Sequence, residues 1–162
     1  MAAVDYFLKI MPVKGESRDK DYKEHIELLS WSIGAHQHGT GGAGGGGGAG
    51  KVQMSDLSIS KHADKSSSDL FLACCNGKHF DEAWIICRKA GEHPLEFLKI
   101  KLQQVLVSSY QTSGHGGDLI PVEQVTLNFA KIQMEYKEQK PDGTAGPSSK
   151  KGWDVAAHQE HS

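Results

Sequence analysis

The spacing of Gly45, Gly50 and Lys51 matches G-x-x-x-x-G-K, the pattern of a loop that cradles the phosphates of a bound nucleotide. That chemistry also needs a Ser or Thr directly after the lysine to hold Mg²⁺, and a helix that begins there. Val52 stands in the hydroxyl position, and the residues after it alternate as in a strand. We therefore predict that this loop binds no nucleotide and that the chain uses no cofactor.

His36 and His38 form a second candidate site. Alternate residues of a strand point to the same side, so two imidazoles could hold a metal ion weakly. No cysteine or carboxylate stands at ligand spacing around the pair. The sequence leaves metal binding by His36 and His38 open, and we expect solvated histidines without a metal function.

The three cysteines, Cys74, Cys75 and Cys87, have neither zinc nor C-x-x-C spacing, so we expect small buried thiols and no disulfide framework. The sequence contains no G-x-S-x-G or H-E-x-x-H motif. A catalytic triad could still be assembled from distant residues, so a small hydrolase or metal-binding enzyme on a β-barrel fold stays as the alternative function.

The composition favours a single globular domain. The chain has 162 residues, a net charge of −2 and 19 glycines, eight of them between residues 41 and 50. This balance gives no general attraction to nucleic acid. No apolar run approaches the roughly 20 residues of a membrane span, and Asp5 and Lys9 interrupt the place where a signal peptide is apolar. We expect the chain to be made and folded in the cytoplasm, without insertion into a membrane.

One short helix is predicted over about residues 66–76. Ser66 and Asp69 fit a capping box, in which the Ser66 hydroxyl accepts a hydrogen bond from the Asp69 amide. Gly77 supplies the left-handed residue that ends a helix. A helix of this length is marginal alone, so it must lie on a sheet.

Six other segments have the period of two that is typical of strands. They are residues 4–10, 26–33, 52–60, the stretch from His79 to Ala90, 95–110 and 122–137. Segment 95–110 fits one long bent strand or two short ones. Segment 122–137 changes phase near Ala130 and Lys131, which indicates a bulge or a change of sheet.

Polar segments separate these strands. We expect residues 14–23 to form a solvated loop, and residues 39–51 a long glycine-rich hairpin loop between two paired strands. After a β domain over residues 1–138, residues 139–162 read as a polar tail. In that tail 140–152 is a linker, Trp153 is the anchor and 158–162 is frayed.

Three motifs, S-K-x-x-D-K-S-S from Ser60, A-C-x-x-G-K-H from Ala73 and R-K-A-G from Arg88, closely resemble those of the hemolysin-coregulated protein (Hcp) family, the tube protein of bacterial type VI secretion. Further matches are F-L-K-I-x-x-V-K-G-E-S from Phe7, the pair Trp31-Ser32, V-L-V-S-S from Val105, V-T-L-N-F-A-K-I from Val125 and the pair Gly152-Trp153. Ser68 stands where the family often has proline, and Glu92 where a second glycine is frequent. Neither departure removes a functional group.

The resemblance implies a mainly β fold, a two-sheet β-barrel with one short flanking α-helix and a long Gly-rich hairpin loop. It also implies that the chain forms homohexameric rings that stack into a tube. The implied partners are the contractile sheath, the trimeric spike protein and small effector proteins in the channel. The tube would be built in the bacterial cytoplasm and then expelled to the extracellular space or into target cells.

Two functional surfaces are expected within this frame. In segment 26–33 the small polar Ser30 and Ser32 face away from Trp31 and Ile33, so we expect these two serines to line the channel and contact cargo. We expect the glycine-rich loop to be a ring-stacking arm, because residues without side chains let backbones approach closely. Its glycines are Gly41, Gly42, Gly44, Gly45, Gly46, Gly47, Gly48 and Gly50.

Overall fold

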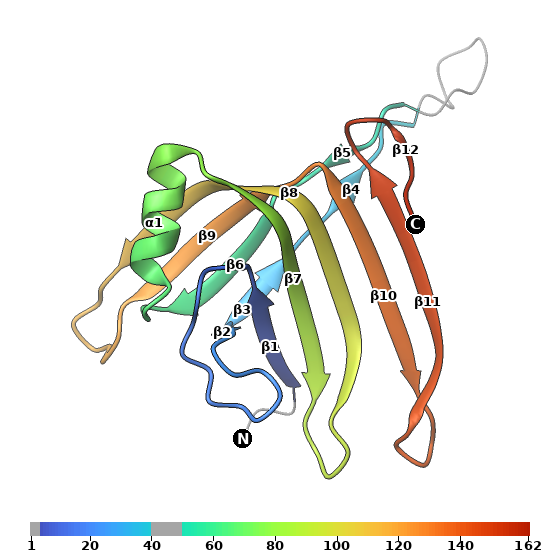
Figure 1. Ribbon diagram of the computed structural model, residues 1–162, viewed down its shortest axis with the longest axis horizontal. Coiled ribbons are helices and arrows are strands. Elements are labelled where there is room, and N and C mark those ends of the chain that lie inside the picture. Colours follow the sequence, from blue (N-terminus) through green and yellow to red (C-terminus); the bar gives the residue numbers. More distant parts are fainter. Residues whose placement is uncertain (1–3, 40–49) are drawn as a thin grey trace.

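The computed structural model describes residues 4–39 and 50–162, and the chain is built mainly of antiparallel strands with one helix (Figure 1). The predicted mainly β class with one short helix is confirmed. The elements are β1 (Val4–Lys9), β2 (Ile26–Glu27), β3 (Ser30–Ser32), β4 (Ala35–His36), β5 (Gln53–Met54), β6 (Leu57–His62), α1 (Ser67–Asn76), β7 (His79–Lys89), β8 (Leu95–Ser113), β9 (Val122–Asn128), β10 (Lys131–Gln139), β11 (Ala145–Asp154) and β12 (Gln159–Glu160).

Ten strands form one continuous sheet, which folds into two layers that we call the large and the small sheet. The large sheet has the order β12-β11-β10-β8-β7-β1-β2, and the small sheet consists of β3, β6, β9 and the second half of β8. β4 and β5 pair only with each other and form a ribbon that projects from the body (Figure 1). The main core cluster lies between the small sheet and strands β1, β7 and β8.

β8 belongs to both sheets, because it is one long bent strand, as the first of the two sequence interpretations proposed. It pairs with β10 as far as Gln103 and with β9 from Leu106 onward. Gln104 between them has φ 54°, a left-handed conformation that a side chain disfavours and that turns the strand. Residues 122–137 change sheet where their phase changes, since β9 lies in the small sheet and β10 in the large one.

The other junction between the sheets lies in the segment 26–33, which was predicted as one strand. That prediction is wrong. β2 pairs with β1, β3 pairs with β6, and the chain changes partner between them. The Leu28 amide donates to the Tyr6 carbonyl at 3.0 Å, and the Leu29 amide donates to the Ser60 carbonyl at 2.8 Å. The segment divides because it links two layers that no single straight strand could join.

The helix packs against β8, and its bounds agree with the prediction. Leu70 and Ala73 face the core, and Gly77 ends the helix with φ 67°. The predicted capping box is wrong. Ser66 is itself helical and makes no side-chain cap; its amide donates to Asp64 Oδ1 at 2.8 Å. The turn before the helix is therefore held by Asp64.

The C-terminal tail is part of the large sheet, and the predicted linker over 140–152 is wrong. β11 pairs with β10 along its length, because an edge strand needs backbone partners more than apolar side chains. The expected fraying of 158–162 is wrong as well. β12 pairs with β11, and the His161 amide donates to the Gly152 carbonyl at 3.0 Å. A Cβ at Gly152 would lie 2.5 Å from the His161 carbonyl oxygen, so this close approach needs glycine.

The segment 14–23 is not a free surface loop, because a buried arginine holds it against the large sheet. Arg88 Nη1 donates to Asp19 Oδ1 at 2.9 Å, and Nη2 bonds the other Asp19 oxygen and Asp5. The guanidinium also lies over the stacked rings of Phe7 and Tyr22, whose centroids are 4.6 Å apart. The hydrogen bond from Arg88 is the main reason that the pKa of Asp19 is lowered to about 2.

This latch makes a prediction about acid stability. Because the folded state lowers the pKa of Asp19 from 3.8, the stabilisation is present above about pH 4 and is lost as the pH falls toward 2. Asp19→Asn should reduce the free energy of unfolding by about 1–2 kcal/mol at pH 7, and the gap to wild type should narrow below pH 4. Urea denaturation at several pH values measures both.

Asp21→Asn is the matched control, because Asp21 is 62% exposed and its carboxylate lies 3.9 Å from Arg88. We expect it to cost less than about 0.5 kcal/mol. An equal effect of the two substitutions at pH 7 would contradict the assignment of the latch to Asp19.

Candidate functional site

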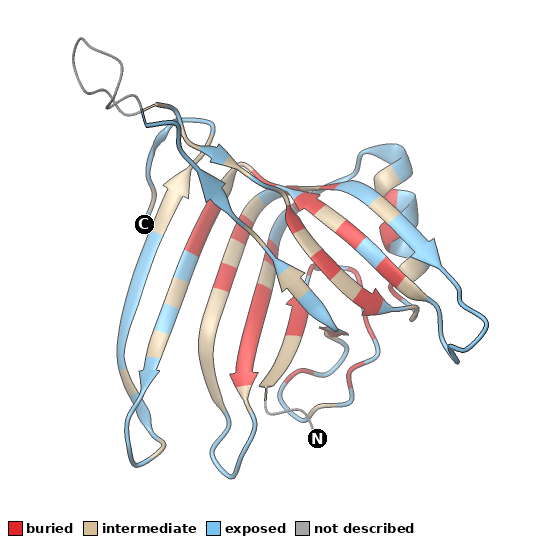
Figure 2. Cartoon of the chain, turned by 180° about the vertical axis from the view of Figure 1, so that it is seen from behind, coloured by how far each residue is buried: buried red, intermediate tan, exposed pale blue. Residues whose placement is uncertain are grey.

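Ser30 and Ser32 lie on the outer face of the small sheet, as the alternation of segment 26–33 predicts. Both are exposed, while Trp31 between them packs against the core. Figure 2 shows the small sheet in front, with buried positions alternating along its strands with exposed and intermediate ones. The two serines therefore look outward from the barrel.

The strand register places Ser30 and Ser32 in two rows that cross four strands, β3, β6, β9 and β8. One row consists of Ser30, Ser60, Gln124 and Gln111, and the other of Ser32, Ser58, Thr126 and Ser109. All eight side chains are uncharged hydroxyls or amides, and directly opposed residues of an antiparallel pair share one face. We call these eight residues the neutral face.

Hydrogen bonds at one end of the neutral face hold its polar groups in place. Ser108 at the bulge of β8 shares a hydrogen bond with the Thr126 hydroxyl at 2.7 Å and donates to Asp56 at 2.6 Å. Asn128 donates to the same carboxylate at 3.0 Å. The Asp56 carboxylate thus accepts hydrogen bonds from two side chains of the sheet.

The charged residues of the same strands point inward. Lys61 and Glu123 are directly opposed on β6 and β9, beneath the neutral face, and they are 0% and 2% exposed. Lys61 Nζ lies 2.7 Å from Glu123 Oε1 and 3.1 Å from Asp64 Oδ1. Ser67 at the start of α1 also donates to Glu123 at 2.7 Å, and the Tyr110 hydroxyl donates to its other oxygen.

The electrostatics of this cluster favour the ionised Glu123 carboxylate and the neutral Tyr110 hydroxyl. Burial alone would raise the pKa of Glu123, but hydrogen bonds from Lys61, Tyr110 and Ser67 outweigh it and hold the pKa below its usual value. Burial and the neighbouring carboxylate raise the pKa of Tyr110 to about 12, so its hydroxyl stays a donor. The cluster ties β6, β8, β9 and α1 together.

The ribbon is the second predicted site, and most of its loop lies outside the described residues. This applies to Gly41, Gly42, Gly44, Gly45, Gly46, Gly47 and Gly48 of the expected stacking arm. The predicted hairpin is confirmed where it can be followed, since Ala35 pairs with Met54 and His36 with Gln53. At Gly50 a Cβ would lie 2.7 Å from the His38 carbonyl oxygen, so the strands approach closely there.

The other candidate residues separate into different places. The rings of His36 and His38 lie edge to face with their centroids 4.8 Å apart, so the two side chains are on the same side, as expected for alternate strand residues. Within residues 4–39 and 50–162, no three His, Cys, Asp or Glu side chains are grouped so that they could hold a metal ion.

The cysteine prediction is only partly right. Cys87 is buried, and burial raises the pKa of its thiol to about 11. Cys75 is exposed, so that part of the prediction is wrong. Val52 is followed by β5 and not by a helix.

Sequence reasoning found two of the eight residues of the neutral face. The signal for the others is the same alternation of small polar and apolar residues in L-S-I-S from Leu57 and in Q-V-T-L from Gln124. What the sequence does not contain is the register that aligns these strands.

Fold and surface together define a mainly β protein with a broad uncharged polar face and a projecting ribbon. A family model described as "Type VI secretion system effector, Hcp" matches residues 7–136. The chain is 51% identical over 155 residues to the protein hcp1 of Pseudomonas aeruginosa, covering 94% of this chain and 96% of that one.

Solved structures agree with the sequence match. The crystal structure of Hcp1 from Salmonella typhimurium superposes with a TM-score of 0.83 at 37% identity, covering 99% of this chain and 100% of that one. A structure described as a type six secretion system protein has a TM-score of 0.93 at 31% identity, covering 98% and 100%. The chain belongs to the Hcp family of type VI secretion proteins. Among the described residues, no helix is long and apolar enough to cross a membrane.

The buried pair generates a prediction about stability. Lys61→Met leaves the Glu123 carboxylate buried without its cation and should reduce the free energy of unfolding by about 3 kcal/mol or more. The double variant Lys61→Met/Glu123→Gln removes both charges and should recover part of this loss. Urea denaturation of the single and double variants measures the coupling between the two residues.

The control is Lys99→Met, which removes a partly exposed lysine 3.5 Å from Glu96. This change should cost less than about 1 kcal/mol. If Lys61→Met is no more harmful than Lys99→Met, the buried pair does not hold the small sheet.

Proposed function

We propose that the protein is the structural subunit of a type VI secretion tube, that six copies form a ring, and that the neutral face lines the channel of stacked rings. Membership of the Hcp family supports the assembly. The observation that carries the assignment of the wall is the pair of rows of uncharged side chains that cross four strands. A channel that passes proteins needs contacts that are weak and well hydrated, and hydroxyls and amides supply them without the strong fields of fixed charges.

The partners follow from this role. Each ring would stack on further rings of the same chain to form a tube. The tube would lie inside the contractile sheath, be capped by the trimeric spike protein and hold small effector proteins in its channel. We place its assembly in the bacterial cytoplasm and its release in the extracellular space or a target cell.

We assign no catalytic role to the chain. Ser67 and Lys61 are of the residue types that serve as nucleophile and base, and Ser67 Oγ lies 3.3 Å from Lys61 Nζ. Lys61 is fully buried and bonded to Glu123, so its ammonium is engaged in structure and is closed to a substrate. The small hydrolase or metal-binding enzyme therefore receives no support from the described residues.

The glycine-rich loop would act as the stacking arm of the ring. The ribbon that carries it projects away from both sheets (Figure 1), so its loop can reach beyond the subunit without disturbing the core. Backbone groups that lack side chains can pair with strand or loop groups of a neighbouring ring.

Ring formation and stacking can be tested separately. Native mass spectrometry should give six copies for wild type, and also for a variant in which Gly44 to Gly48 is shortened to two residues, because loop length changes closure entropy slowly. Electron microscopy should show tubes for wild type and isolated rings for the variant. A monomeric wild type would overturn the tube assignment, whereas normal tubes from the shortened chain would overturn only the stacking arm.

The wall is tested at Ser32, which lies in the second row of the neutral face. Ser32→Gln should leave the hexamer intact and reduce the amount of effector that copurifies or is secreted, because a longer amide narrows the channel. Ser68→Gln, on the exposed first turn of α1, is the matched control and should have no effect. Equal cargo levels in both variants and wild type would count against the placement of Ser32.

A further inference from the structure

The large sheet extends beyond the small sheet that covers it. One cross-strand row shows this, running from Leu8 through Ile85, Ile100 and Met134 to Lys151. The side chains of the first three residues are 0% exposed, that of Met134 is 43% exposed, and that of Lys151 is also exposed. Because opposed residues share a face, Met134 and Lys151 lie on the core side of the sheet, past the end of the core.

The next row has the same gradient. Cys87 is 0% exposed, Leu98 is half-buried, and Tyr136 on β10 is 48% exposed. We call Met134, Tyr136 and Lys151 the overhang. Figure 2 shows that β10 and β11 stand clear of the small sheet on this side.

The overhang combines two large apolar side chains with one ammonium group. No ion pair of Lys151 occurs within residues 4–39 and 50–162, whereas Lys99, Lys101 and Lys131 of neighbouring strands each lie within 4 Å of a carboxylate. Exposed apolar residues at the edge of a sheet mark a surface that another element covers. The covering element should offer apolar side chains and a negative charge.

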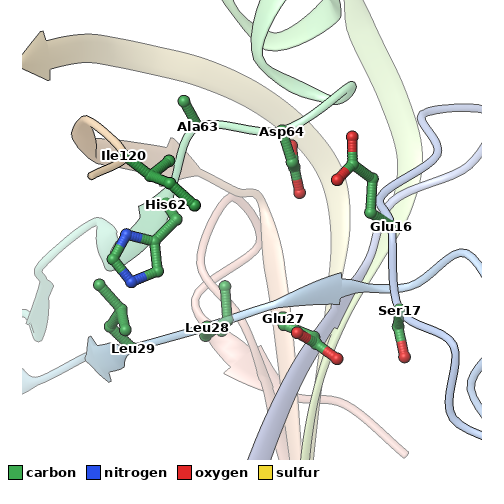
Figure 3. Close-up of a pocket in the computed structure, with 9 residues that line it drawn as sticks. All are labelled: Glu16, Ser17, Glu27, Leu28, Leu29, His62, Ala63, Asp64 and Ile120. Atoms are coloured by element: carbon green, nitrogen blue, oxygen red, sulfur yellow. The ribbon is translucent and has the colours of Figure 1, made fainter.

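The opposite edge of the large sheet offers such a surface. A cavity of about 280 Å³ opens where the chain crosses from β2 to β3, and we call it the notch. Figure 3 shows Glu16 and Asp64 at one end of the notch, with Leu29 and Ile120 at the other. Leu29 and Ile120 are each 47% exposed.

The carboxylates of the notch differ in whether another group of the chain pairs with them. Asp64 shares its charge with Lys61 at 3.1 Å, and Glu16 accepts a backbone hydrogen bond from Lys65 at 3.0 Å. Glu27 on β2 is exposed and forms no ion pair with any described residue. Glu16 and Glu27 thus give the notch an excess of negative charge beside its apolar end.

We propose that the overhang of one copy seats in the notch of the next copy around the ring. Met134 and Tyr136 pack on Leu29 and Ile120, and the Lys151 ammonium pairs with Glu27 and Glu16. The two surfaces lie at opposite edges of one sheet, so a single chain cannot join them. A head-to-tail contact of this kind closes into a ring when the rotation from one copy to the next divides a full turn. The inference rests on the proposed ring and identifies the two surfaces that form it.

A second interpretation of Lys151 assigns it to protection of an edge. Lysines on edge strands prevent unwanted strand pairing, and both Lys150 and Lys151 stand on β11. Lys150 is opposed to Glu135 on the other face of the strand. A protective role would make the two lysines equivalent, whereas a seat in the notch requires only Lys151.

Charge reversal distinguishes these roles. Lys151→Glu and Glu27→Lys should each raise the concentration at which the hexamer dissociates by about tenfold or more, measured by native mass spectrometry across a dilution series. Lys150→Glu should dissociate as wild type does. Circular dichroism of the variants checks that each subunit is folded.

Mixing the two reversed variants gives the decisive result. In a ring in which Lys151→Glu and Glu27→Lys subunits alternate, every contact is either wild-type or doubly reversed, so an equimolar mixture should form hexamers at concentrations at which each variant alone is dissociated. A monomeric wild type would overturn the proposed ring itself. With a hexameric wild type, the interface proposal is overturned if Lys151→Glu assembles normally, if Lys150→Glu is equally harmful or if the mixture fails to assemble.

Discussion

The continuity of β8 through its bend at Gln104 is the constraint on which both sheets depend. The half before the bend pairs with β7 and β10, and the half after it pairs with β9. Leu102 and Val107, one from each half, are both buried in the same core. Because one covalent strand supplies a central strand to the large sheet and an edge strand to the small one, the angle between the layers is set locally. The segment 26–32 makes the second connection between the layers.

The local part of this fold could be predicted from the sequence, and the pairing could not. Alternation located the strands, and Gly77 located the end of the helix, because both signals depend on neighbouring residues. The change of partner at Leu28 depends on two layers that meet only in the folded chain. β11 gave no signal either, since its polar side chains leave the backbone hydrogen bonds to hold it in the sheet.

The candidate site follows the same division. Ser30 and Ser32 could be placed on an outward face from alternation alone, but only register brings Ser60 and Ser58 beside them. Lys61 was the least predictable residue of the site, because a lysine on a short strand is ordinarily solvent exposed. Its burial depends on partners from three other parts of the chain, which are β9, the turn before α1 and α1 itself. No local sequence pattern predicts these contacts.

The uncharged character of the neutral face has a consequence for the media that the tube would encounter. Attraction between fixed charges and a passing protein weakens steeply with salt, since the screening length is about 10 Å at 0.1 M and about 3 Å at 1 M. The two rows of hydroxyls and amides contain no such charges, and the ion pair beneath them is shielded by burial. Passage along this wall would therefore proceed with the same ease in dilute and in concentrated electrolyte, for acidic and basic cargo alike.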